Sequence, residues 1–492
     1  MRYETFETLS GDERSIPIVD RMYIGGEFVT GSTVFENYSP STETKLADVP
    51  IASERQIQRA VNEAQNASQK WRKMSVWERR ERVETVADAI EEKTDELTQL
   101  EVADNGSCIS KLTDDVHSGV KTLRYFAGIA TELKGDSIPA SPDTVDYTKR
   151  EPYGVVAGII PFNHPAAFVA RKLGPAVIAG NGLVIKPSEY TPLSALYIAH
   201  IIDNTTAFPD GLVNIVTGGA DVGKSLVRHP GVGMISAIGS SETGKSIMRG
   251  AAENLSNVLL ELGGKNPVIV FPDADLETAA DGVIDSMNLT WQGQSCGSGS
   301  RLLVHENLYQ PMIESITERI SSLEIGDPFD RDNDIGSIVS EPQYEKVRAY
   351  IENAKEEGAN VLTGGSPVET FDTGYFFKPT LLEVTPEMTI ANEETFGPVL
   401  SVIQWSDYDE MIDIANNVDY GLTASIWTEN LDTAHRTTEK LEAGVVWVNH
   451  HGNHYLGAPF GGYKQSGVGK TESIEELLEH TRIKNINIKL RE

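Results

Sequence analysis

Short runs of apolar residues alternate with helix-like stretches through the middle of the chain. The first series occupies residues 155–160, 182–185, 212–216 and 268–271, and the stretches between these runs end in Gly or Pro. Continuous apolar runs of this length are typical of strands buried on both faces. Their alternation with helices predicts βαβ units that form a parallel sheet.

A second series of apolar runs follows at residues 301–304, 399–403 and 445–448. Residues 52–104 instead show the charge-rich spacing of amphipathic surface helices. A chain of 492 residues is too long for a single hydrophobic core. We therefore expect two α/β domains, preceded by a polar dozen residues at the N-terminus.

Composition restricts where the protein works. No apolar run approaches the roughly 18 residues that a membrane span needs, and no apolar targeting segment follows Met1. The chain has only two cysteines, Cys108 and Cys296, which is typical of a reducing compartment. We expect a cytoplasmic protein that does not associate with membranes.

The chain is strongly acidic. Asp and Glu number 73 against 42 Lys and Arg, which leaves a formal net charge of −31. Such a surface repels phosphate backbones and anionic lipids, so nucleic acids and membranes are poor partners. Because the excess is spread along the chain, it resembles the solvating coat of proteins that work in concentrated salt, and a halophilic source is a hypothesis.

Cys296 is surrounded by small residues. Three glycines and three serines lie within residues 292–301, which leaves the thiol unshielded and lets backbone N–H groups approach whatever the sulfur attacks. This context favours a nucleophile. An inert buried cysteine remains the alternative at this point.

Two stretches fit the phosphate-binding formula G-x-x-x-x-G-K-[ST], Gly218–Ser225 and Gly239–Ser246. Each follows an apolar run, and helices beginning at Gly223 and Gly244 would favour a phosphate. A nucleoside triphosphatase is therefore an alternative. Against it, the two stretches start closer together than the roughly 30 residues of one βαβ unit, and no strand that ends in a magnesium-binding Asp follows.

Other polar residues stand at expected strand ends. Glu261 follows an apolar stretch and precedes two glycines, so it is a candidate general base or a turn residue. Asn163 follows the run 155–160 and could donate to an oxyanion or make a turn. Lys186 with Glu189, and later Glu394, could bind a ribose or be solvated.

In this order the segments resemble the aldehyde dehydrogenase superfamily, from about Met22 to Lys489. The resemblance implies an α/β fold with a Rossmann-like cofactor-binding domain, an α/β catalytic domain and a small β oligomerisation element. The matching segments are Pro161-Phe162-Asn163, Lys186 to Glu189, Gly239-Ser240 with Gly244, Glu261 to Gly264, Gly293-Gln294-Ser295-Cys296, Glu394 to Pro398, and Pro459 to Gly467.

By this resemblance, Cys296 attacks an aldehyde carbonyl, and Asn163 with the backbone N–H of Cys296 holds the oxyanion. Hydride leaves to a nicotinamide, and a thioester remains. Glu261 activates the water that hydrolyses this thioester to a carboxylic acid, and Lys172 matches a lysine near the base. No metal site is implied.

The resemblance also implies the ligand contacts. Because Glu189 would repel the 2′-phosphate of NADP, NAD is the expected cofactor and use of NADP should be weaker. The expected cofactor residues are Pro161, Phe162, Lys186, Ser188, Glu189, Gly219, Gly239, Ser240, Gly244, Leu262, Glu394 and Phe396. The expected substrate residues are His164, Phe168, Arg171, Thr290, His454 and Phe460.

This polar lining favours a small polar aldehyde or a semialdehyde. Arg171 matches an arginine of succinate-semialdehyde and lactaldehyde enzymes, but Thr290 occupies the place of the second arginine of the former. The chain also departs from relatives at Thr290-Trp291-Gln292, at Ser298 and at Gly469-Lys470-Thr471. The last departure removes an acidic residue that some relatives use as a proton exit, and Glu472 or water could replace it.

We expect three units. Residues 1–130 with 151–262 form the NAD-binding domain, 263–465 the catalytic domain, and 131–150 with 466–492 the oligomerisation element. A homodimer or homotetramer is expected. A CoA-acylating enzyme remains an alternative, although that branch typically lacks the base that Glu261 supplies.

Overall fold

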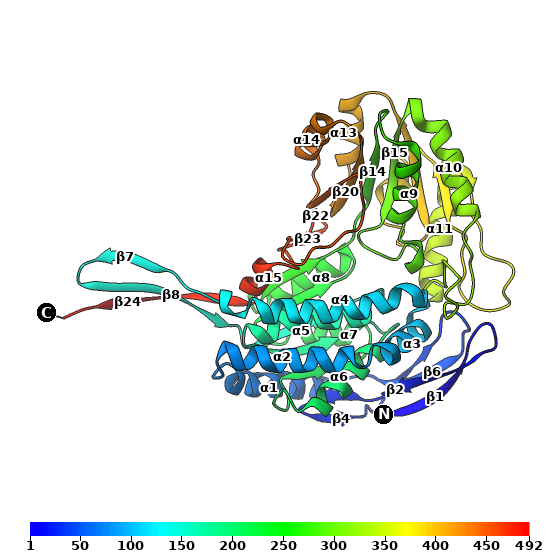
Figure 1. Ribbon diagram of the computed structural model, residues 1–492. Helices are drawn as coiled ribbons and strands as arrows, with labels where there is room; N and C mark the ends of the chain where they lie inside the picture. The colour runs from blue at the N-terminus through cyan, green and yellow to red at the C-terminus, as the bar shows by residue number, and fades with distance from the viewer. Residues whose placement is uncertain (492) are drawn as a thin grey trace.

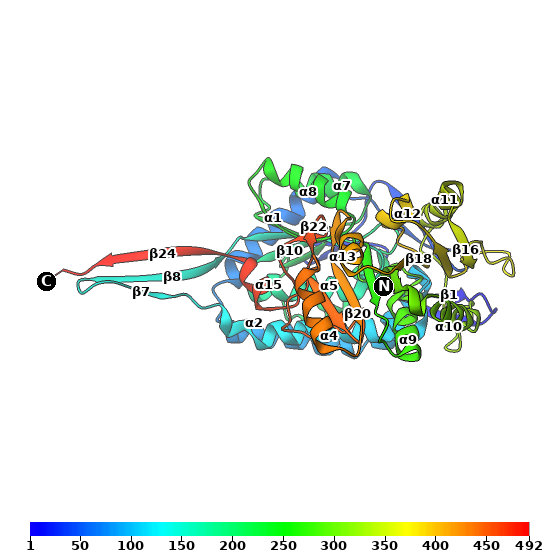
Figure 2. The same cartoon turned by 90° about the horizontal axis from the view of Figure 1, so that it is seen from above.

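The computed structural model describes residues 1–491. Two twisted sheets with their helices lie one above the other, and a long three-stranded arm leaves the body to one side (Figure 1). Seen from above, the arm extends far beyond both sheets and carries the C-terminal end of the chain (Figure 2).

The first sheet has eight strands in the order β23-β13-β12-β9-β10-β11-β3-β4. Its five central strands are parallel and both edges are antiparallel. Three of the five follow the first series of apolar runs, whereas the run at 268–271 belongs to the second sheet. The bounds are β3 Met22–Ile24, β4 Glu27–Val29, β9 Val155–Ile159, β10 Gly182–Lys186, β11 Val213–Ile215, β12 Met234–Ile238, β13 Asn257–Glu261 and β23 Gly467–Val468.

Helices cover both faces of this sheet because the strands are apolar on both sides. Helices α1, α7 and α8 contribute to one core cluster, and α2 to α6 contribute to the other. The bounds are α1 Glu54–Trp71, α2 Val76–Glu91, α3 Thr94–Asn105, α4 Ile109–Gly128, α5 Pro165–Ile178, α6 Leu193–Thr205, α7 Ala220–Val227 and α8 Ser241–Ala252. The helices expected within residues 52–104 are thereby confirmed.

The second sheet has seven strands in the order β16-β17-β18-β15-β14-β20-β21, parallel except at β16. Its strands are β14 Asn266–Val270, β15 Gly299–His305, β16 Asn360–Thr363, β17 Thr380–Glu383, β18 Val399–Trp405, β20 Thr423–Trp427 and β21 Val445–Val448. Its helices are α9 Leu276–Ser286, α10 Tyr309–Ser321, α11 Glu341–Glu357, α12 Thr389–Asn392, α13 Tyr408–Asn416 and α14 Leu431–Lys440.

The arm combines β7 (Ser137–Ser141) and β8 (Thr144–Pro152) with β24 (Thr481–Lys489). Strand β24 pairs with β8 in an antiparallel register that runs from Thr481 opposite Pro152 to Lys489 opposite Thr144. Helix α15 (Ile474–Glu479) precedes β24 and packs near α5. The arm exposes apolar side chains, namely Ile138, Val145, Ile483, Ile488 and Leu490.

Small elements complete the fold. Strands β1 (Arg2–Glu7) and β2 (Glu13–Ile18) form a hairpin in the polar N-terminal segment. The remaining pairs are β5 (Val34–Tyr38) with β6 (Lys45–Pro50), and β19 (Tyr420–Gly421) with β22 (Tyr463–Lys464). Three short 3₁₀-helices span Ala130–Glu132, Leu289–Trp291 and Glu306–Leu308.

One local prediction is wrong. Helices α7 and α8 begin at Ala220 and Ser241, so Gly223 and Gly244 lie inside helices rather than at helix N-termini. The N-caps are Gly219 and Ser240, each four residues before the expected helix start. Neither stretch therefore has its Gly-Lys pair at the start of a helix, where a phosphate-binding loop requires it.

No helix in residues 1–491 is long and apolar enough to cross a lipid bilayer. The mixed α/β fold class expected from the sequence is confirmed. The three domain boundaries stay a prediction. Strand β23, which falls within the expected oligomerisation element, pairs with β13 of the first sheet.

Candidate active site

Cys296 lies in a tight loop between a 3₁₀-helix and β15. The loop needs glycine at Gly293, where φ is +69° and an added Cβ would lie 2.2 Å from the carbonyl oxygen of Gly397. Asn266 on β14 fixes the loop from beneath, since its side-chain nitrogen donates to the carbonyl oxygens of Cys296 and Ser298, each at 2.8 Å. The loop that carries Cys296 is thus held by the Asn266 side chain and by the backbone at Gly397.

The surroundings of the thiol oppose its ionisation. Burial raises the pKa of Cys296 to about 12, and the carboxyl groups of Glu261 and Glu394 act in the same direction, while Arg171 opposes them. At neutral pH the group is therefore a thiol. A nucleophilic role requires a nearby base that removes its proton.

Glu261 is such a group. It ends β13, is 4% exposed, and accepts a hydrogen bond from the Thr471 hydroxyl at Oε1 (3.3 Å). Its Oε2 is buried without a hydrogen-bond partner among residues 1–491. Burial raises the pKa of Glu261 well above its usual value, so this carboxylate is a stronger base than one in water.

Two further expected catalytic residues, Asn163 and Lys172, are buried. Asn163 is 3% exposed, and its Oδ1 has no hydrogen-bond partner within the described chain. Lys172, on α5, donates to the Ser236 hydroxyl at 2.9 Å. Burial lowers the pKa of Lys172 to about 8, although the charges of Glu476 and Glu261 oppose that change. Lys172 therefore interacts electrostatically with Glu261 and Glu476.

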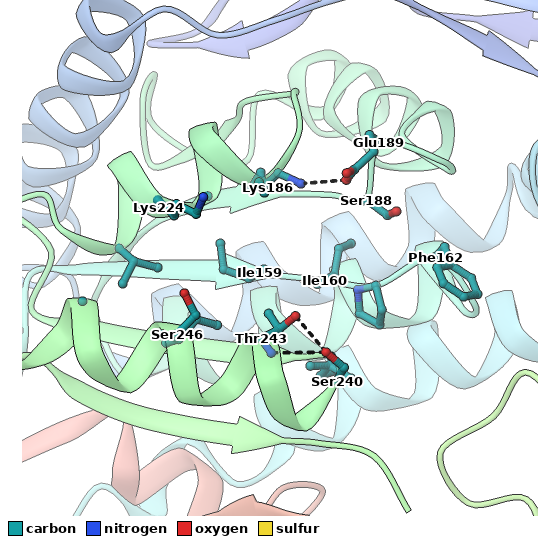
Figure 3. Close-up of a pocket in the computed structure, with 18 of the residues that line it drawn as sticks. Ile159, Ile160, Phe162, Lys186, Ser188, Glu189, Lys224, Ser240, Thr243 and Ser246 are labelled. Atoms are coloured by element: carbon teal, nitrogen blue, oxygen red, sulfur yellow. Dashed lines mark hydrogen bonds and ion pairs between the residues drawn. The ribbon is translucent and has the colours of Figure 1, made fainter. Parts of the chain in front are cut away.

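A pocket of about 360 Å³ opens beside the carboxyl ends of β9, β10 and β12 (Figure 3). Lys186 and Glu189 lie on one wall, with Lys186 Nζ 3.3 Å from Glu189 Oε2. Ser240, the N-cap of α8, lies on the opposite wall and accepts from the backbone N–H of Thr243 at 3.2 Å. Between them, apolar side chains of α7 and α8, including Val227 and Ile247, form a slot.

These walls suit a dinucleotide. Lys186 and Glu189 offer a donor and an acceptor for ribose hydroxyls, the start of α8 offers backbone N–H groups to a pyrophosphate, and the apolar slot is suited to a planar base. Of the twelve expected cofactor residues, seven line this pocket: Pro161, Phe162, Lys186, Ser188, Glu189, Gly239 and Ser240.

The other five expected cofactor residues lie outside the pocket lining. Glu394 accepts from the backbone N–H of Gly264 at 2.9 Å, and the ring of Phe396 packs edge-on against Phe162 at 5.6 Å between centroids. These two residues therefore extend the site from the pocket towards Cys296. Gly244 packs under Leu262, and Gly219 caps α7 near Glu189.

An acidic and aromatic cluster surrounds His164, the residue that follows Asn163 in the chain. His164 Nδ1 lies 2.7 Å from Asp115 Oδ2, to which the indole N–H of Trp291 also donates at 3.1 Å. Phe168 packs against His164 with ring centroids 5.3 Å apart. The carbonyl oxygen of Thr290 accepts a hydrogen bond from the backbone N–H of Cys108 at 3.3 Å. The backbone of Thr290 therefore stabilises the contact between these two segments.

Arg171 is ion-paired within the protein. Its Nη2 lies 2.6 Å from Glu472 Oε1, and His454 Nδ1 lies 3.0 Å from Glu472 Oε2. His454 also packs on Phe460, with centroids 4.7 Å apart. Although burial alone would raise the pKa of Glu472, Arg171 and His454 lower it to about 2. Glu472 is therefore a weak base.

A family model described as "Aldehyde dehydrogenase family" matches residues 28–486. The chain belongs to the aldehyde dehydrogenase family. It is 39% identical over 493 residues to aldehyde dehydrogenase tropH of Talaromyces stipitatus, covering 97% of this chain and 95% of that one. The resemblance seen in the sequence is confirmed, and the comparisons do not support a triphosphatase or a CoA-acylating enzyme.

Solved structures of aldehyde dehydrogenases share the fold. The NAD⁺ complex of an aldehyde dehydrogenase from Bacillus cereus is 40% identical, with a TM-score of 0.93 and 96% of both chains covered. An NADP complex of 3,6-anhydro-L-galactose dehydrogenase is 34% identical, with a TM-score of 0.93 and coverage of 95% of this chain and 99% of that chain.

The structure brings Cys296, Glu261, Lys172 and Arg171 into one electrostatic environment, as their mutual effects on pKa show. Three contributors were missed by the sequence analysis: Asp115, Asn266 and Glu476. Glu476 lies in α15 beside Glu475 and looks in sequence like part of a solvated acidic surface, yet it is 2% exposed. Only its burial distinguishes it.

Proposed function

We propose that this aldehyde dehydrogenase oxidises a small polar aldehyde to the carboxylic acid with NAD as the preferred cofactor. The observation that supports this most directly is the half-buried Cys296, with the raised-pKa carboxyl of Glu261 near it and a dinucleotide-shaped pocket on the adjoining sheet edge. When bound, NAD supplies a ring that accepts hydride.

The residues of the chain divide the remaining work. Glu261 takes the Cys296 proton, directly or through water, and the thiolate adds to the aldehyde carbon. The Asn163 amide N–H and the Cys296 backbone N–H donate to the developing oxyanion. After oxidation of the adduct to a thioester, Glu261 removes a proton from water, which attacks the acyl carbon and releases the acid and the Cys296 thiol.

Proton release proceeds from Glu261 towards Glu476 rather than Glu472. Glu472 is ion-paired with Arg171 and hydrogen-bonded to His454, which lower its pKa to about 2, so it accepts protons poorly. Glu476 is buried, its Oε1 has no hydrogen-bond partner in residues 1–491, and burial raises its pKa. Its carboxylate is therefore a better proton acceptor than that of Glu472.

For the cofactor, Glu189 lies at the expected ribose end of the pocket and disfavours a 2′-phosphate, while Lys186 offers a partial counter-charge. We therefore expect weaker use of NADP. For assembly, the exposed apolar side chains of the arm support a homodimer or homotetramer. A cytoplasmic location stays a prediction.

A panel of aldehydes with NAD and with NADP, followed by the absorbance of the reduced nicotinamide, tests the proposal. The wild type should reduce NAD with small polar aldehydes. Cys296→Ser should lower kcat by about 10³-fold or more, because the hydroxyl is a far weaker nucleophile. Activity that survives in Cys296→Ser would refute the nucleophile.

A further inference from the structure

A second large cavity lies far from the pocket beside α7 and α8, at the root of the arm. Its volume is about 780 Å³, and it is lined by residues of the α1–α2 junction on one side and of β8 and β24 on the other. Strands β8 and β24 leave the body of the molecule beside α2 (Figures 1 and 2). We call this cavity the root groove. Nothing in the proposed mechanism uses it.

The root groove reverses the charge balance of the molecule. In the whole chain acidic residues outnumber basic ones by 73 to 42, but the groove is lined by seven basic side chains and one carboxylate. From the helices come Arg72, Lys73 and Arg79. From the strands come Lys149, Arg150, Arg482 and Lys484. The concentration of positive charge here is therefore a local feature.

The charge is not neutralised within residues 1–491. The carboxylate of the groove, Glu151, lies 2.7 Å from Lys484 Nζ, and this is the one ion pair among the described groove residues. The Lys484 hydrogen bond lowers the pKa of Glu151, and Lys149 and Arg482 act at longer range in the same direction. The other six basic side chains of the groove form no ion pair among the described residues. Such an excess of positive charge attracts an anion.

Two of the guanidinium groups are held in place by neutral acceptors. Arg79 is 7% exposed, and its Nε and Nη1 donate to the carbonyl oxygens of Ile178 and Met74, both at 3.1 Å. Arg150 Nη1 donates to the Leu478 carbonyl at 3.3 Å and to the Thr481 hydroxyl at 3.1 Å. Since a guanidinium has five N–H donors, both keep donors available for a ligand.

We infer that the root groove binds a small soluble polyanion that carries several phosphate or carboxylate groups. Preoriented arginines recognise such groups by paired N–H contacts, and the exposed Arg72, Lys73, Lys149 and Arg482 surround the buried Arg79. Because the groove joins the arm to α2, the bound polyanion crosslinks the two and stabilises the arm root.

Inorganic tripolyphosphate, titrated into the full chain by calorimetry at low salt, tests the inference. Binding should occur with and without saturating NAD and should raise the unfolding temperature. Arg72→Glu combined with Arg482→Glu should weaken binding by about ten-fold or more, because two attractive contacts become repulsive. The double variant Lys73→Glu with Lys149→Glu is a second test and should weaken binding in the same way.

The matched control is Lys111→Glu combined with Lys121→Glu, which makes the same change in net charge on exposed positions of α4 outside the groove. It should leave tripolyphosphate binding within about two-fold of wild type. Absence of binding, equal weakening in control and groove variants, or displacement by NAD would each overturn the inference. Sedimentation would also overturn the inference if the groove variants dissociated into smaller assemblies and tripolyphosphate did not bind to wild type. The groove would then be a contact between subunits.

Discussion

At the scale of single residues, the site is defined by ionisable groups that are buried where water cannot stabilise their charged forms. Cys296, Glu261, Lys172 and Glu476 all have pKa values displaced towards their neutral forms, and burial is the first cause in each case. The raised pKa of Glu261 makes its carboxylate a stronger base than one in water. In the proposed mechanism, this property allows Glu261 to serve both the thiol and the hydrolytic water.

Arg171 provides the first prediction. Because its charge is already paired with Glu472, Arg171→Ala should change KM for a semialdehyde and for a neutral aldehyde by similar factors, about three-fold or less apart. Steady-state kinetics on a matched pair of substrates measures this. A selective rise in KM for the semialdehyde would instead show that Arg171 binds the substrate carboxylate.

Glu476 provides the second. Ionised Glu476 raises the pKa of Glu261, so Glu476→Gln should lower it and move the acid limb of the kcat profile to lower pH. The sign follows because Glu261 acts as a base only when ionised: a lower pKa extends its active range downward. The plateau should also fall several-fold if protons leave through Glu476.

The measurement is a pH profile of kcat for wild type and Glu476→Gln. Glu475→Gln, the adjacent position in α15, is the control and should not move the limb. A limb that stays in place with Glu476→Gln would contradict the coupling between Glu476 and Glu261.

At the scale of elements, the nucleophile loop depends on its contact with the segment that carries Glu394 and Phe396. Gly293→Ala places a Cβ against the Gly397 carbonyl at positive φ and should destabilise the protein by roughly 2–4 kcal/mol. Denaturant unfolding measures the change. Gly297→Ala, in the same loop with no atom within 4 Å of its added Cβ, should change stability far less.

The sequence predicts the elements better than their contacts. Apolar runs predict seven of the strands, because strands buried on both faces must be apolar throughout. These strands are β9, β10, β11, β14, β15, β18 and β21, whereas β12, β17 and β20 of the same sheets were not predicted. The hairpin β1–β2 could not be found in this way, since its outward positions are polar. The helix starts at Ala220 and Ser241 were missed because the Gly-Lys motif suggested later ones.

The site residues divide in the same way, into those that a sequence motif identifies and those that only the folded structure identifies. Cys296, Glu261 and Asn163 belong to short motifs with recognisable composition, so the sequence nominates them before any contact is known. Glu476 and Asp115 belong to ordinary polar stretches and acquire their places only when α15 packs near α5 and when α4 meets the Trp291 segment. The pairing of Arg171 with Glu472 spans 301 positions of chain and has no local signal.

At the scale of the whole molecule, a net charge of −31 opposes compaction through self-repulsion. Screening shortens the range of that repulsion to about 3 Å at 1 M salt. The unfolding temperature should therefore rise by roughly 10 °C or more between dilute buffer and molar KCl. Differential scanning calorimetry across a KCl series tests this, and an unfolding temperature indifferent to salt would refute the halophilic hypothesis.

The central claim is that Cys296 carries the acyl group and Glu261 releases it. Intact-protein and peptide mass spectrometry of Glu261→Gln, incubated with NAD and an aldehyde substrate at alkaline pH, where part of the Cys296 thiol ionises without this base, tests both halves at once. The account predicts that the acyl group of the substrate accumulates as a thioester on the peptide containing Cys296, and that wild type shows little of it. An unmodified Cys296 in a variant that still reduces one equivalent of NAD would contradict the account.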